Sequence, residues 1–133
     1  MADFTFDLVS PERRLAQMDA TEVQIPGADG DMTAMAYHSP TITTLRPGIL
    51  SVTHSGGVSE FVVSGGFAEI TATGVSVLAE KAFLRSEAKQ EHVDKLVSDA
   101  TAAVDAAKQS GVDVDEAELA LHHVSETVRT LLV

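Results

Sequence analysis

Apolar and polar residues alternate along the first part of the chain, as they do on strands that bury one face. Turn-forming residues separate these runs at 26–30 (PGADG), 46–48 (RPG) and 54–57 (HSGG). The alternating apolar positions are Phe4, Phe6 and Leu8; Val23 and Ile25; Met32, Ala34 and Ala36; Leu50 and Val52; Ala68, Ile70 and Ala72; and Val75, Val77 and Ala79. Many short strands of this kind predict an all-β sandwich or flattened barrel over residues 1–85.

The apolar spacing then changes from two to three or four residues, which is typical of one-sided helices. All four prolines and eight of the nine glycines lie at or before Gly74, and only Gly111 interrupts the later part. Two apolar stripes result: Val93, Val97, Ala100, Val104 and Ala107, and then Val114, Ala117, Leu121, Val124, Val128 and Leu131. They predict an antiparallel α-helical hairpin over residues 86–133, with helices of about 20 to 24 residues. Asp113 and Glu116 resemble a capping box for the second helix.

The composition disfavours several classes of partner and of binding site. A formal charge of −11 disfavours nucleic acid and anionic lipid as partners, because binding to phosphates needs clustered Lys and Arg. The chain has no cysteine, so it forms neither a disulfide nor a thiolate metal site. Asp3 and Asp7 stand where a signal peptide would carry basic and then apolar residues, and no run is long enough to span a membrane. We therefore expect no direct membrane insertion.

A search for catalytic or ligand-binding patterns finds no nucleophile elbow, phosphate-binding loop or dinucleotide fingerprint. His122 and His123 are adjacent on a helix and point about 100° apart, so they cannot ligate one metal together. Asp29 and Asp31 mimic part of a calcium loop, but Pro40 stands where the final Glu would be. We expect the paired glycines of Ser64–Phe67 to form a strand bend. These residues predict a protein without catalytic, cofactor-binding or metal-binding residues.

Several short motifs in a fixed order make the chain resemble the epsilon-subunit family of bacterial proton-translocating ATP synthases over essentially its full length. They are Val-x-Ser ending at Ser10, G-x-x-G-D at Gly27–Asp31, H-x-P at His38–Pro40, R-P-G at Arg46–Gly48 and S-G-G-F at Ser64–Phe67. The resemblance implies a non-catalytic central-stalk (rotor) subunit. It would sit peripherally on the cytoplasmic face of the bacterial inner membrane and couple rotation of the c-ring, driven by proton flow, to ATP synthesis.

The same resemblance implies partners and contact residues. The sandwich would bind the gamma subunit and the c-ring, and in some members the hairpin reaches the alpha/beta catalytic head. Asp29, Gly30, Asp31 and Met32 would form the loop that faces the c-ring. Ser10 and His38 would lie near the gamma side. One departure concerns the loop before His38, where many members carry Pro-Gly and this chain carries Ala36 and Tyr37.

The hairpin also departs from members in which it inhibits ATP hydrolysis. From 113 to 133 the only base, Arg129, is set against five acids, a formal charge of −4. The acids are Asp113, Asp115, Glu116, Glu118 and Glu126. The segment Val93–Ser98 lacks the Arg-Ala pair of an ATP-binding signature. We therefore expect a weakly inhibitory hairpin that ATP does not control. The residues alone leave one alternative, a β-sandwich adaptor that recruits a partner through its hairpin.

Overall fold

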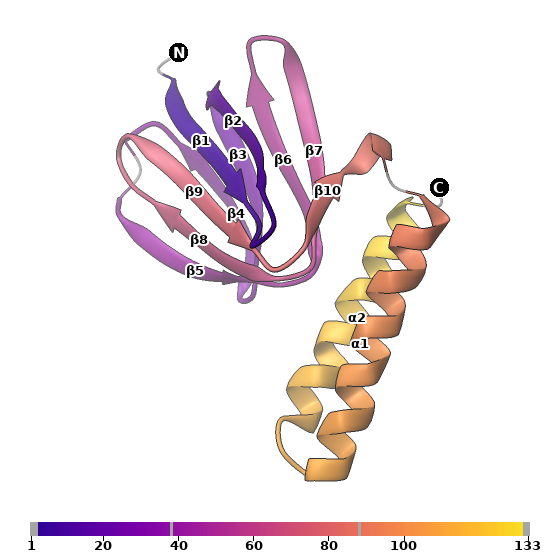
Figure 1. Ribbon diagram of the computed structural model, residues 1–133. Helices are drawn as coiled ribbons and strands as arrows, with labels where there is room; N and C mark the ends of the chain where they lie inside the picture. The colour runs from indigo at the N-terminus through magenta and orange to yellow at the C-terminus, as the bar shows by residue number, and fades with distance from the viewer. Residues whose placement is uncertain (1–2, 38, 88, 132–133) are drawn as a thin grey trace. The chain divides into compact units, whose positions relative to one another are not determined.

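Strands occupy the first part of the chain and two long helices occupy the last part (Figure 1). The structure is a computed structural model, and it describes residues 3–37, 39–87 and 89–131. The strands are β1 (Phe4–Val9), β2 (Arg14–Ala20), β3 (Glu22–Gly27), β4 (Gly30–Met35), β5 (Thr41–Leu45), β6 (Gly48–His54), β7 (Gly57–Val63), β8 (Gly66–Ile70), β9 (Gly74–Ala79) and β10 (Ala82–Leu84). A 3₁₀ turn, η1 (Arg85–Glu87), precedes α1 (Gln90–Ser110) and α2 (Val114–Leu131). The chain divides into two units, Met1–Ser86 and Glu87–Val133, one residue beyond the expected boundary.

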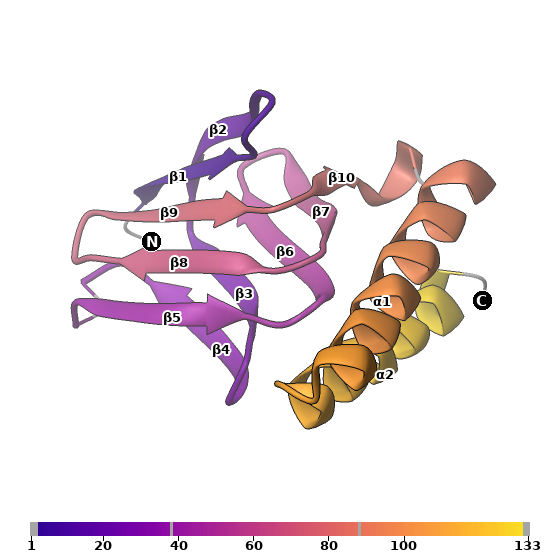
Figure 2. The ribbon, with the colours of Figure 1, turned by 60° about the horizontal axis from the view of Figure 1, so that its bottom comes forward.

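The strands form one hydrogen-bonded path in the order β10-β7-β6-β3-β5-β8-β9-β1-β2, and β4 pairs with β3. Only β1 and β9 run parallel; the other pairs along this described path are antiparallel. One residue pair, Gly27 with Leu45, joins β3 to β5. The sheet folds over at this weak junction, so that β5, β8, β9, β1 and β2 form one layer (Figure 2). The all-β sandwich prediction is confirmed.

The core of the sandwich consists of the inward side chains of both layers. Phe6, Leu8, Ile25, Leu50 and Ile70 are all essentially inaccessible to solvent. Burial of each such side chain contributes about 1.5–3 kcal/mol relative to its exposure. The alternation that predicts the strands therefore has its physical cause here, since every second side chain enters this core.

The predicted strand face that ends at Ala72 is too long by one position. Strand β8 ends at Ile70, and Ala72 is exposed. The hydroxyl oxygen of Thr71 accepts a hydrogen bond from the backbone N–H of Gly74 (3.1 Å), and the N–H of Thr71 donates to the carbonyl of Gly74 (2.9 Å). These local bonds close a tight turn before Ala72 can reach the inner face.

The helical unit packs along a narrow seam, and it confirms the predicted hairpin. Val93, Leu96, Val104 and Ala107 of α1 are buried, as are Val124 and Thr127 of α2. Gly111 adopts φ 74° and donates its N–H to the carbonyl of Ala107, so α1 ends in a left-handed glycine cap. No helix in the described residues is long and apolar enough to cross a membrane.

Two details of the hairpin prediction are wrong. Val97 is 36% exposed, and Leu96 takes its place in the seam. Spacings of three and four residues are both compatible with one helix face, and the larger side chain, Leu96, is the one buried. Asp113 has φ 57°, outside the extended conformation of an N-cap, although its carbonyl accepts a hydrogen bond from the N–H of Ala117. The start of α2 is therefore not a capping box.

In the loop between β4 and β5, Ala36 and Tyr37 stand where many family members carry Pro-Gly, and the backbone of Tyr37 is strained. Tyr37 has φ 67°, a conformation that glycine adopts readily and a tyrosine does not. Its N–H donates to the carbonyl of Ala72 (3.0 Å), which holds the residue in place, while its ring is 80% exposed. Hydrogen bonding thus compensates for a conformation that the side chain opposes.

Two glycines allow a matched test of the bend between β7 and β8. Gly66 has φ 127°, and a Cβ added there would lie 2.0 Å from the carbonyl oxygen of Leu78. Gly57 has φ 125°, and an added Cβ would meet no atom within 4 Å. We expect Gly57→Ala to lower the free energy of unfolding by about 1 kcal/mol through backbone strain alone. We expect Gly66→Ala to lower it by at least about 3 kcal/mol, because the clash adds to the strain.

Urea unfolding followed by circular dichroism measures both values. Equal losses at the two glycines would contradict the close approach of β8 and β9 at Gly66.

Candidate partner-binding surfaces

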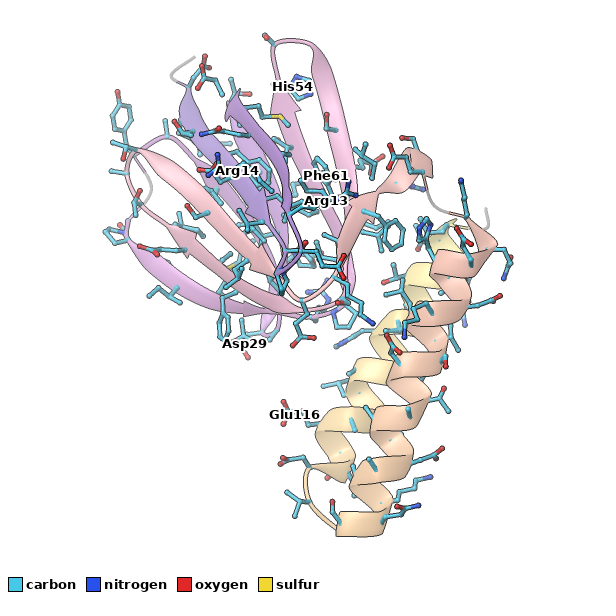
Figure 3. All side chains as sticks on the ribbon, viewed as in Figure 1. Arg13, Arg14, Asp29, His54, Phe61 and Glu116 are labelled. Carbon is cyan, nitrogen blue, oxygen red and sulfur yellow. The ribbon has the colours of Figure 1, made fainter. Side chains whose placement is uncertain are left out.

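The turn between β3 and β4 contains the loop that the sequence singles out. Ala28 and Asp29 connect the two strands, and Asp29, Gly30 and Asp31 are all exposed. Figure 3 shows Asp29 at one end of the sandwich, with His54, the last residue of β6, at the other. Asp29 in the turn and Asp31 near the start of β4 thus present two acidic side chains at a single end of the β unit.

Arg46 fixes this turn from the neighbouring β5–β6 connection. One guanidinium nitrogen donates to the carbonyl oxygen of Gly27 (2.6 Å), and the other donates to a carboxylate oxygen of Asp31. The backbone N–H of Arg46 also donates to the carbonyl of Pro26 (2.9 Å). Because the planar guanidinium holds one group before the turn and one after it, the turn is constrained at both ends.

The remaining predicted contact residues differ in accessibility. Met32 is half-buried and packs against the sandwich core, so it supports the turn more than it extends from it. Ser10 is 8% exposed, and its hydroxyl and backbone N–H both donate to the carbonyl of Arg13. Its side chain therefore stabilises the β1–β2 turn. His38 lies outside the described residues.

A second surface, the outward face of β5, β8, β9, β1 and β2, was not predicted; we call it the docking face. Strand register aligns Phe67, Leu78 and Val9 across β8, β9 and β1 in one row. Phe67 is 56% exposed and Leu78 53%, and Ile42 of β5, which pairs with Glu69 in the next row, is 74% exposed. Adjacent exposed apolar side chains of this size are unfavourable in water and typically mark a protein-binding surface.

A polar row runs beside the apolar one on the docking face. Glu69, Ser76 and Asp7 are aligned across β8, β9 and β1. The two rows surround a shallow depression of about 470 Å³, whose lining also includes Arg14. The docking face therefore combines exposed apolar area with two carboxylates.

The sequence contains a signal for this surface, but the signal depends on knowing the strand register. Phe67 and Leu78 are out of phase with the buried positions Ala68 and Val77, so each is an apolar residue on the polar face of its strand. Their alignment becomes visible only when β8 is paired with β9. The bonds of Arg46 to the acidic turn have no local sequence signal beyond the R-P-G motif, because its partners lie 15 and 19 residues away.

Neither surface has the features of a reactive site. Within the described residues, no three His, Asp or Glu side chains gather closely enough to hold a metal ion. The rings of His122 and His123 are 5.9 Å apart and tilted by 56°. Exposed apolar, acidic and backbone groups can form contacts with another protein, and this is the chemistry that the two surfaces offer.

Comparison with known proteins agrees with this picture. The family model for the ATP synthase Delta/Epsilon chain, beta-sandwich domain, matches residues 3–85. The ATP synthase epsilon chain of Fuscovulum blasticum is 61% identical over 120 residues, which cover 90% of this chain and 89% of that protein. The chain belongs to the ATP synthase epsilon-chain family. The epsilon chain of Ruegeria sp. (strain TM1040) is 59% identical over 101 residues, covering 75% of this chain and 74% of that one.

Solved structures extend the likeness to the whole fold. A chain in the Euglena gracilis mitochondrial ATP synthase, in a structure of OSCP, F1 and the c-ring, matches with a TM-score of 0.74 and 26% identity. The match covers 100% of this epsilon-family chain and 83% of that chain. As an epsilon chain, the protein is a non-catalytic central-stalk subunit of ATP synthase, and the adaptor alternative is set aside.

The role of Arg46 can be tested by separating its two contacts. Arg46→Met removes both contacts, whereas Asp31→Asn removes the charge pair and keeps the bond to the Gly27 carbonyl. We expect Arg46→Met to raise the amide hydrogen-exchange rates of residues 27–32 by roughly tenfold, the effect of losing about 1.4 kcal/mol of local stability.

Asp31→Asn should raise those rates by less than about threefold, because the Asp31 side chain is 79% exposed and its ion pair is weak. Equal exchange in Arg46→Met and the unmodified chain would show that Arg46 does not constrain the turn.

Proposed function

We propose that this epsilon-family chain couples c-ring rotation to the ATP synthase head by touching two partners at once. The Asp29–Met32 turn contacts the c-ring, and the docking face contacts the gamma subunit. The observation that carries the proposal is the presence of both surfaces on one β unit, an exposed acidic turn fixed by Arg46 and an exposed apolar sheet face. As part of this complex, the chain sits peripherally on the cytoplasmic face of the bacterial inner membrane.

The turn suits contact with the polar loops of a ring. Asp29 forms no ion pair within the described residues, so its carboxylate is available to a basic or amide group. Asp31 already pairs with Arg46, which reduces its value as a contact. The turn therefore acts through its shape and through Asp29, and each exposed contact contributes only about 0–1 kcal/mol.

The docking face offers the gamma subunit more accessible contact area than Ser10, whose side chain is buried. Val9, the neighbour of Ser10, points outward and aligns with Leu78 and Phe67. Burial of these side chains against a partner would contribute about 25 cal/mol per Å² of apolar area removed from water. The expectation that the Ser10 region faces gamma is retained, with Val9 as the contact in place of Ser10.

Torque transmission requires that the two surfaces keep a fixed separation. The inward side chains between them include Phe6 and Phe61, whose rings pack 6.4 Å apart. Close-packed interiors of this kind deform little under load. The sandwich can therefore carry force from the turn to the docking face without a moving part and without chemistry of its own.

The hairpin contributes little to inhibition in this proposal. The acidic residues of the first turn of α2, Asp115 and Glu116, are exposed, and Figure 3 shows Glu116 projecting from the helix. The one base of α2, Arg129, is already paired with Glu126 at 3.1 Å. An acidic surface on the head would repel such a helix, since like charges that lose water cost free energy.

The contact with the c-ring can be tested by replacing the turn. We expect a Gly/Ser replacement of residues 28–32 to leave ATP hydrolysis by the reconstituted synthase active and to abolish the proton pumping coupled to it. Asp31→Ala alone should reduce pumping only slightly. The matched control is His54→Ser/Val58→Ser, next to the β6–β7 turn at the opposite end of the sandwich, where Figure 3 labels His54. Pumping should survive in that variant.

Cysteine cross-linking gives an independent measurement. Cysteines at positions 29 and 31 should form cross-links with cysteines in the c-ring loops, and a cysteine at 55 should form none. Failure of both positions, or equal yields at all three, would rule out the turn as the c-ring contact.

The hairpin prediction is tested by truncation after Ser86, at the end of the β unit. We expect ATP hydrolysis by the reconstituted complex to change by less than about twofold, because the acidic helix gives no inhibitory contact to lose. Calorimetry of the intact chain should detect no ATP binding. A tenfold rise in hydrolysis on truncation, or micromolar ATP binding, would show that the charge pattern has been misinterpreted.

A further inference from the structure

One carboxylate on the docking face is incompletely satisfied. The Oδ1 atom of Asp7 is buried and has no hydrogen-bond partner among the described residues. The nearest cation is Arg14, whose Nε lies 4.0 Å away, beyond hydrogen-bonding distance. The Nη1 of Arg14 instead donates to the Oε1 of Gln17 (3.3 Å). A buried acceptor without a donor costs free energy in the isolated chain and calls for an explanation.

A second carboxylate lies on the same row. Asp7 is aligned with Ser76, and Ser76 with Glu69, so the two acids stand two strands apart, roughly 10 Å at the backbone. Glu69 is exposed and forms no ion pair within the described residues. The small side chain between them, Ser76, leaves room above the sheet for a long side chain to approach both.

The charge at this position is unbalanced. Asp7 and Glu69 face one base, Arg14, whose side chain is 61% exposed and turned toward Gln17. A quarter of the Asp7 side chain remains exposed although its Oδ1 atom is buried, so a partner can reach the carboxylate group from outside the sheet through its exposed part. Beside these carboxylates lies the apolar row of Phe67, Leu78 and Val9.

We propose that the partner of the docking face presents an apolar strip flanked by a Lys or Arg, which lies over Ser76 and pairs with both Asp7 and Glu69. This inference rests on the proposed docking of the gamma subunit and specifies the chemistry of that contact. The apolar row supplies the buried area, and the carboxylates select the register and orientation of the segment that binds. The formal charge of −11 on the whole chain attracts a basic partner from a distance.

The test measures binding of the full chain to a complex of alpha, beta and gamma subunits prepared without this chain and without the c-ring. We expect the double variant Asp7→Asn/Glu69→Gln to bind roughly tenfold more weakly at low ionic strength. The loss should shrink at high salt, because screening already weakens the pairing in the unmodified chain. Thermal unfolding of each variant verifies that the sandwich is intact.

The matched control is Asp29→Asn/Asp31→Asn. It removes the same charge from the turn whose proposed partner, the c-ring, is absent from the probe, and binding should change by less than about twofold. A second variant, Arg14→Gln, separates two sources of the cation. If the partner supplies it, binding should strengthen or stay unchanged. If Arg14 rearranges to satisfy Asp7 on docking, Arg14→Gln should weaken binding as much as the acidic double variant, and the proposal is overturned.

Phe67→Ser/Leu78→Ser distinguishes this inference from the docking proposal beneath it. Loss of binding in this apolar variant, with unchanged binding and salt dependence in Asp7→Asn/Glu69→Gln, would retain the docking face and reject the basic contact. Unchanged binding in both variants would reject the docking face and the basic contact together. Weakened binding in both, with the turn control unaffected, is the result that supports both proposals.

Discussion

The alternation of side chains along each strand is the constraint on which both surfaces of the β unit depend. Once Leu8 and Val77 enter the core, the intervening residues must face outward, so burial on one side of the sheet determines what the other side displays. A slip of one residue between β8 and β9 would place Phe67 inside and Ala68 outside. The core therefore stabilises the fold and also specifies which side chains a partner meets.

The acidic turn depends on a different kind of interaction. Asp29 and Gly30 are exposed, and hydrogen bonds position their turn. Strands β3 and β4 pair up to Gly27 and Gly30, the N–H of Ala28 donates to the carbonyl of Thr44 (2.8 Å), and the Arg46 side chain bonds to residues on both sides of the turn. Such contacts are weaker and more sensitive to salt than core packing. The β unit thus has one surface whose side chains are specified by core packing and one, the acidic turn, that hydrogen bonds of the backbone and of the Arg46 side chain hold in place.

The sequence predicts the strands and helices, which local periodicity determines, but it does not predict contacts between residues that are far apart in the chain. Strands and helices follow from local spacing, yet the pattern places Ala72 and Val97 wrongly on buried faces, because a hydrogen-bonded turn at Thr71 ends the strand and Leu96 fills the helix seam. The conformation of Asp113 could not be inferred from its residue type, since aspartate tolerates both extended and left-handed backbones. The docking face required strand register, and the constraint by Arg46 required knowledge of contacts between distant turns.

The two units differ in their density of negative charge. Residues 1–86 carry ten acids and five bases, a formal charge of −5, whereas the shorter segment 87–133 carries ten acids and four bases, a charge of −6. The hairpin therefore has the higher density of negative charge and, in its described residues, a seam built mainly of Val, Ala and one buried Leu. Repulsion along a helix pair with so little buried apolar area limits the stability it can contribute. The β unit has the large aliphatic core, and its docking face carries one carboxylate oxygen, Asp7 Oδ1, without a hydrogen-bond donor among the described residues. These two features are the reason that we assign the proposed partner contacts to the sandwich and not to the hairpin.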